Sequence, residues 1–258
     1  MLDFWFDLPA PGMFAALAAV YALIGAAIHV ITFRSPFRSL SYSLTGVAPP
    51  LFGVVGLLFG LLTGFLASDI NDNNIQAARA VGAETNALYE VRTLSVASAS
   101  DMADIRDALR EYIRSELQDE WPTMGSFGRS VKTESAFGNL LRQVSDPRIA
   151  REAGNAVHAA LLSAVSRAGL ARSQRIAIST NSTNTVKWIT VFVLAAITQL
   201  AIGLVHVERP RAQITALTLF TLALVAALGF MAIQEWPFAG PLQVKPTPLR
   251  EILDQIPA

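Results

Sequence analysis

Residues 51–68 read LFGVVGLLFGLLTGFLAS and contain no charged side chain. A helix of about 20 apolar residues crosses the roughly 30 Å of hydrocarbon in a bilayer, and this stretch approaches that length. Because backbone polar groups in lipid must be paired within their own segment, we expect a transmembrane helix here.

Three further runs share this composition and contain no Asp, Glu, Lys or Arg: residues 13–33, 188–207 and 214–233. The first is preceded by Asp3 and Asp7 and is too long for a signal peptide, so we interpret it as a retained span. The four runs explain why 52% of the residues are hydrophobic and only 16% are charged, since a soluble domain carries about a quarter charged residues.

The polar stretches between these runs predict an all-α membrane protein with four transmembrane helices in a 2+2 arrangement. Residues 1–68 hold the first pair of spans, and residues 69–187 form an extramembrane insert. Residues 188–236 hold the second pair, and residues 237–258 form a proline-rich tail with a short amphipathic helix.

The insert is expected to be a small helical bundle, because no stretch in it alternates apolar and polar residues like a strand. Ser100 is placed to cap a helix, and residues 147–178 predict one long helix that continues into the third span. The absence of proline between Pro50 and Pro122 likewise predicts that the second span continues beyond the membrane. The apolar stripe of the helix after Ser100 comprises Ile105, Leu109, Tyr112, Ile113 and Leu117.

Four spans place both termini and the insert on one side of the membrane. The short loops carry Arg34, Arg38, Arg209 and Arg211, whereas basic residues near the ends of the insert are more widely spread. The higher density of arginine in the short loops favours a cytoplasmic location for these loops and an extracytoplasmic insert in a bacterial inner membrane.

Several classes of function find no support in the composition. The chain has no cysteine, three histidines and a formal net charge of zero, so a metal site and nucleic-acid binding are not expected. Asp119 and Glu120 are adjacent and diverge around a helix, and no nucleotide-binding or hydrolase motif occurs. We expect neither catalysis nor a cofactor.

The second span carries the most specific pattern. Its glycines lie three or four residues apart on one side of a helix, which favours close packing of helices: Gly53, Gly56, Gly60 and Gly64. One interpretation is a pore-lining helix with an apolar constriction, and the other is ordinary packing in lipid. In the remaining spans, Gln199, Thr215, Thr218 and Thr221 are candidates for a hydrated path or for bonds between helices.

Four stretches together resemble the bacterial bestrophin-like membrane family: ARAVGAETNALYEVRTL (78–94), ALREYIRSELQDEWP (108–122), ARSQRIAIS (171–179) and WPFAGPLQVKPTPLREIL (236–253). The resemblance implies an oligomeric anion channel whose second span lines a central pore with rings of apolar side chains. By position, the implied pore-lining residues are Phe52, Val55, Phe59, Leu62 and Leu66. It also implies a cytoplasmic insert, opposite to the arginine distribution, and the sequence lacks the acidic calcium-binding segment of animal bestrophins.

The tail is expected to run extended through LQVKPTP (242–248) and to end in a short helix. Leu249, Ile252 and Leu253 share one face of that helix, which is too short to be stable alone. We therefore expect this helix to dock on its own insert or on a neighbouring subunit. The alternative is a frayed tail.

Two hypotheses for function follow. The first is a homo-oligomeric channel, with the lipid bilayer and further copies of this chain as partners. The second is a non-conducting scaffold or accessory subunit that binds a partner protein through its insert.

Overall fold

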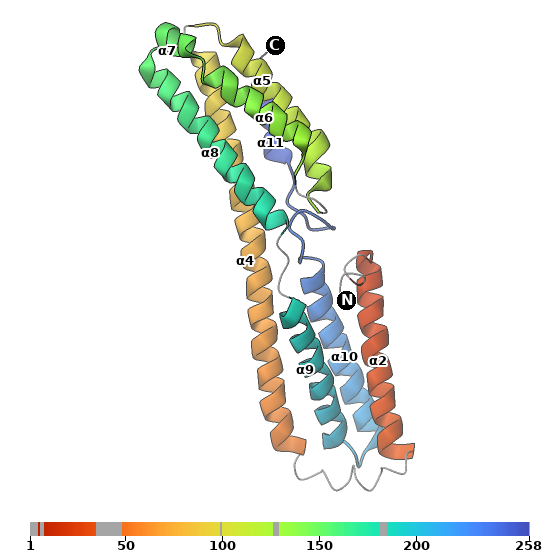
Figure 1. The fold of residues 1–258 in the computed structure, drawn as a ribbon. Helices are drawn as coiled ribbons and strands as arrows, with labels where there is room; N and C mark the ends of the chain where they lie inside the picture. Colours follow the sequence, from red (N-terminus) through yellow and green to blue (C-terminus); the bar gives the residue numbers. More distant parts are fainter. Residues whose placement is uncertain are drawn as a thin grey trace. The chain divides into compact units, whose positions relative to one another are not determined.

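A computed structural model describes residues 5, 8–34, 48–98, 100–125, 129–180 and 185–257. Within these ranges the chain is helical and contains no strand, which confirms the all-α prediction. Among the described residues, four helices are long and apolar enough to cross a membrane: α2 (Ala10–Arg34), α4 (Ala48–Ala97), α9 (Thr185–Val205) and α10 (Pro210–Ala232) (Figure 1). Most of the first predicted loop, residues 35–47, lies outside the described residues.

The chain divides into two compact units. Unit 1 comprises Met1–Asp72 and Thr183–Glu235, and unit 2 comprises Asn73–Ser182 and Trp236–Ala258. The 50-residue helix α4 contributes its apolar part to unit 1 and its polar part to unit 2, and the tail groups with the insert.

Unit 1 is built from α2, α9, α10 and the apolar part of α4. Helix α2 packs against α10 and α9. Glycines permit these close approaches, since a Cβ at Gly203 would lie 2.3 Å from Cγ2 of Ile28. The Tyr21 hydroxyl donates a 2.9 Å hydrogen bond to the carbonyl of Phe192, and the Trp188 indole donates one of 3.1 Å to Glu235.

Unit 2 packs the polar part of α4 with the helices of the insert and the tail. These helices are α5 (Ala103–Ser115), α6 (Val131–Val144), α7 (Pro147–Ala153), α8 (Asn155–Ser179) and α11 (Thr247–Gln255). A π-helical turn, Glu116–Glu120, and a 3₁₀ turn, Trp121–Thr123, follow α5 directly. Ile105, Leu109, Tyr112 and Ile113 of the predicted stripe are buried in the core of this unit.

Three predicted helix boundaries are wrong. Helix α5 begins at Ala103, whose N–H donates to the Asp101 side chain, so Ser100 is not its cap. Gly154 has φ 89°, a conformation that favours glycine, and it divides the predicted long helix into α7 and α8. Helix α8 ends at Ser179 and α9 begins at Thr185, so the third span is a separate helix, with residues 181–184 outside the described part.

Candidate functional site

The apolar part of α4 is the least covered of the four spans. Only 11% of its most hydrophobic window is buried, against 22% in α2, 44% in α9 and 28% in α10. Most of the surface of this span is therefore available to lipid, to an ion pathway or to another copy of the chain.

The residues that the resemblance placed along a pore mostly face the interior of unit 1. Val55 and Leu66 are only 8% and 1% exposed, and Leu62 packs partly against the same core. The Phe59 ring lies 5.9 Å from that of Phe220. Of the five, Phe52 alone is exposed. The core of unit 1 uses most of these large side chains, and the assignment of the five residues to a pore stays a prediction.

A different set of large apolar side chains points away from the core of unit 1. Leu57 is the most exposed of them, at 72%, and the others recur every three or four residues along one side of the helix. We call this set the α4 ridge: Val54, Leu57, Leu58, Leu61 and Phe65. It was missed from the sequence, because nearly every residue in this span is apolar.

The glycines of α4 contact no other helix in the described part of the chain. A Cβ built on Gly53, Gly56, Gly60 or Gly64 would meet nothing within 4 Å beyond its own helix. At 100° per residue, these glycines lie roughly a quarter turn from the α4 ridge. If they pack against a helix, that helix is not one of those that the structure describes in this chain.

Most of the polar residues described in the other spans bond between helices, and Thr215 bonds within its own helix. The Gln199 amide donates to the Tyr21 carbonyl at 2.9 Å and to the Thr221 hydroxyl at 3.1 Å. Thr215 donates to the carbonyl of Arg211 in its own helix. Nδ1 of His29 lies 2.8 Å from Oε1 of Gln213.

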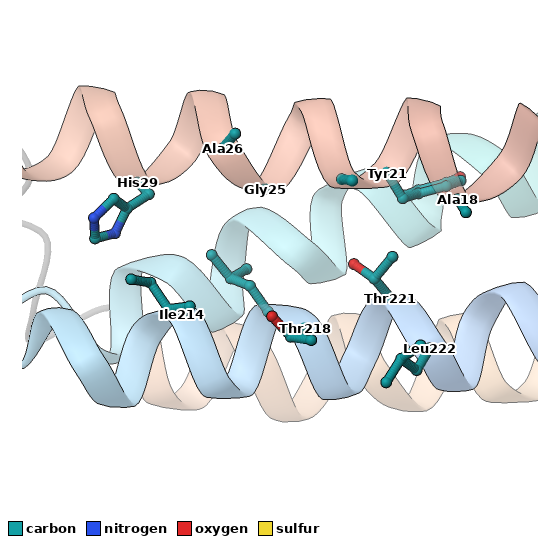
Figure 2. Close-up of a pocket in the computed structure, with 11 residues that line it drawn as sticks. Ala18, Tyr21, Gly25, Ala26, His29, Ile214, Thr218, Thr221 and Leu222 are labelled. Carbon is teal, nitrogen blue, oxygen red and sulfur yellow. The ribbon is translucent and has the colours of Figure 1, made fainter. Parts of the chain in front are cut away.

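A cavity of about 490 Å³ lies between α2 and α10 (Figure 2). Gly25, Ala26 and His29 line it from α2, and Thr218 and Thr221 line it from α10. Since Thr221 and His29 already bond to Gln199 and Gln213, these polar groups serve to hold helices together. The exposed surface of α4 is therefore the stronger candidate for an ion pathway.

Unit 2 contains a network of fully buried charges. Arg175 donates from Nε to Glu84 at 2.7 Å, and from Nη2 to Glu116 at 2.6 Å and to Glu120 at 3.0 Å. Arg172 donates two hydrogen bonds to Glu120, at 3.1 and 2.5 Å. Salt bridges buried this completely are costly to break, since removing one partner leaves a buried charge without compensation.

The sequence stretches that carry the family resemblance supply this network. Glu84 lies in the first stretch, Glu116 and Glu120 in the second, and both arginines in the third. Composition and periodicity did not predict that these residues form one cluster. The available signal was spacing, since Arg172 and Arg175, like Glu116 and Glu120, lie on one face of a helix.

The tail stretch, residues 236–253, contacts the stretch of residues 108–122 through aromatic rings. The Trp121 ring packs edge-on against Phe238 of the tail, with centroids 5.8 Å apart, and the Arg175 guanidinium lies 5.3 Å from the Trp121 ring centre. Leu249 and Ile252 of α11 are buried in the core of unit 2, and Leu253 packs partly against it. The tail therefore covers the insert of its own chain.

Comparisons with known proteins are consistent with this architecture. A family model described as Bestrophin-like domain matches residues 19–249. Two crystal structures of a bacterial bestrophin homologue from Klebsiella pneumoniae, one of them a point mutant, are similar in fold. The mutant structure has a TM-score of 0.70 at 11% identity, with 93% of this chain and 95% of the homologue covered. The other has a TM-score of 0.69 at 13% identity, with 93% and 96% covered. A search of curated proteins gives no match.

Proposed function

We propose that this chain, which belongs to the bestrophin-like family, assembles with copies of itself into a channel that conducts anions along α4. The uncovered apolar part of α4 is the observation that carries the proposal. The chain is a membrane protein of a channel family, and a single copy leaves large apolar side chains and a row of glycines on α4 without a partner.

The two free surfaces of α4 suit a closed ring of subunits. A helix in such a ring presents one face to the central axis and a flanking face to its neighbour. We assign the α4 ridge to the axis and Gly53, Gly56, Gly60 and Gly64 to the neighbouring subunit, because small residues permit close approach of helices. Repetition around the axis would turn Leu57, Leu61 and Phe65 into stacked apolar rings, which is the kind of constriction that gates by dewetting.

The absence of charge on residues 51–68 supports conduction of weakly hydrated anions such as chloride. An apolar ring offers no ligand to replace a hydration shell, so ions that lose water easily are favoured. We place the channel in a bacterial inner membrane, with the termini and the insert on one side. The arginine distribution favours the extracytoplasmic side, and protease treatment of right-side-out vesicles distinguishes this from the cytoplasmic placement of bestrophins.

Gly60→Leu should leave the fold of each protomer intact and break the ring. A Cβ at this position meets nothing within 4 Å among the described residues, but the added side chain would overpack a subunit interface at a cost of about 1–3 kcal/mol. Light scattering in mild detergent should show loss of the oligomer with unchanged helix content by circular dichroism, and liposomes should lose the chloride flux of the wild type.

The matched control is Ala223→Leu, which adds similar bulk to an exposed position of α10. This variant should retain both the oligomer and the flux. An intact oligomer after Gly60→Leu would remove the glycines from the interface. A monomeric, non-conducting wild type would favour the scaffold hypothesis instead.

A further inference from the structure

The buried network of unit 2 has more negative than positive groups. Glu84, Glu116 and Glu120 are 0% exposed, whereas the guanidiniums that face them are those of Arg172, 4% exposed, and Arg175, 0% exposed. Tyr112 is the other titratable group in the network, and its hydroxyl donates to Glu84 at 2.6 Å. Glu134 contacts only the outer edge, where it accepts from Arg172 at 3.0 Å.

The hydrogen bonds identify the carboxylate whose negative charge is not fully satisfied by donors. Both oxygens of Glu84 accept, from Arg175 and Tyr112, and both oxygens of Glu120 accept, from the two arginines and the Ser130 N–H. Glu116 accepts one bond, at Oε1 from Arg175. Its Oε2 is fully buried and has no partner among the described residues.

A buried ionised oxygen without a partner is strongly unfavourable, and a carboxyl group in that position takes up a proton instead. We propose that Glu116 binds one proton at neutral pH and that this protonated carboxyl is a pH-sensitive latch that holds the Glu116–Glu120 turn closed against α8. The site is distinct from the ion pathway proposed for α4, and it does not depend on conduction.

The surroundings support this assignment. Burial, followed by the charge of Glu84, raises the pKa of Glu116 well above its ordinary value, and the charge of Arg175 opposes this only in part. Burial also disfavours ionisation of Glu120, but the hydrogen bond from Arg172 and the charges of Arg175 and Arg172 bring its pKa below the ordinary value. The proton therefore belongs to Glu116, and Glu120 remains ionised.

The latch lies in the part of unit 2 where the helix is least regular. Residues Glu116–Glu120 form a π-helical turn, and the chain then passes into a 3₁₀ turn. π-helical turns are rare and frequently occur at functional sites. The π-helical turn directs Glu116 and Glu120 together toward Arg175, so loss of the Glu116 proton would place a further negative charge between Glu84 and Glu120.

The direction of the pH effect follows from proton linkage. The closed turn binds a proton that an open turn, with an ordinary Glu pKa, releases. Between those two pKa values the closed state holds more protons, so its stability falls as pH rises. The latch is fully closed in acid and opens as pH rises through the raised pKa of Glu116.

Hydrogen exchange of the full chain in detergent tests this inference. After correction for intrinsic exchange rates, the opening equilibrium constant of peptides covering residues 112–125 should increase about tenfold per pH unit in the wild type. Glu116→Gln keeps the shape of the protonated acid without the titration and should remove this slope. Glu134→Gln, which changes a carboxylate at the outer edge of the network, should retain it.

Infrared spectroscopy gives a second readout of the same proton. The wild type at neutral pH should show the carbonyl band of a protonated carboxyl group, and Glu116→Gln should lack it. An unchanged slope in Glu116→Gln, or no such band in the wild type, would overturn the proposal. If Glu116→Gln does not fold, the wild-type spectrum decides alone, since the band must be present at neutral pH and disappear in alkaline solution.

Discussion

Arg175→Met should destabilise unit 2 by about 3–5 kcal/mol, the range found when one partner of a buried ion pair is removed. The substitution keeps most of the side-chain volume. Among the described residues, it leaves Arg172 as the one buried cation near Glu84, Glu116 and Glu120. It also removes the cation that lies 5.3 Å from the centre of the Trp121 ring. Thermal unfolding followed by circular dichroism should show the loss, and limited trypsin digestion should locate it in unit 2.

The control for this prediction is Arg167→Met in the same helix. Arg167 pairs with Glu90 at the surface, where both side chains are about half exposed. Exposed pairs contribute about 0–1 kcal/mol, so this variant should unfold close to the wild type. Equal stability of the two variants would show that the buried network does not hold unit 2 together.

Leu61→Ser should increase the chloride conductance of the reconstituted protein by about tenfold, the effect of lowering a barrier by about 1.4 kcal/mol. Leu61 is 52% exposed on the α4 ridge, and a hydroxyl at this position makes a dewetted constriction easier to hydrate. Because every subunit of the proposed channel would contribute one copy, one substitution would change a whole ring of its pore. Single-channel recording in planar bilayers measures the change.

Leu219→Ser is the matched control, since Leu219 is 62% exposed but lies on α10. It should leave the conductance unchanged, because a side chain that faces lipid does not touch the ion. Equal effects of the two substitutions would mean that the α4 ridge has no special relation to the pathway.

The four spans and the helical insert could be predicted from sequence because each depends on local composition. Apolar runs of sufficient length define the spans, and the 3.6-residue period identified the buried face of α5 through Ile105, Leu109 and Tyr112. Gly154 was not recognised as a break, because glycine is also tolerated inside helices and its φ of 89° depends on tertiary packing.

The exposed face of α4 could not be predicted in the same way. In residues 51–68 almost every side chain is apolar, so the pattern does not distinguish Val55, which is buried, from Leu57, which is exposed. Further along α4, buried residues such as Ala77, Glu84 and Leu88 alternate with exposed ones. The spacing of its charged residues was the available signal, but the charge network was not recognised, because its members come from three separate stretches and burial of a charge is not a sequence property.

Cysteine accessibility along α4 tests the central claim most directly, because the chain has no native cysteine. Single cysteines at positions 57, 61 and 65 should react with a charged, water-soluble thiol reagent in reconstituted liposomes, and the reaction should reduce chloride flux. A cysteine at position 219 should remain unmodified. Continued flux with no modification at the three α4 positions would contradict a pore lined by this helix.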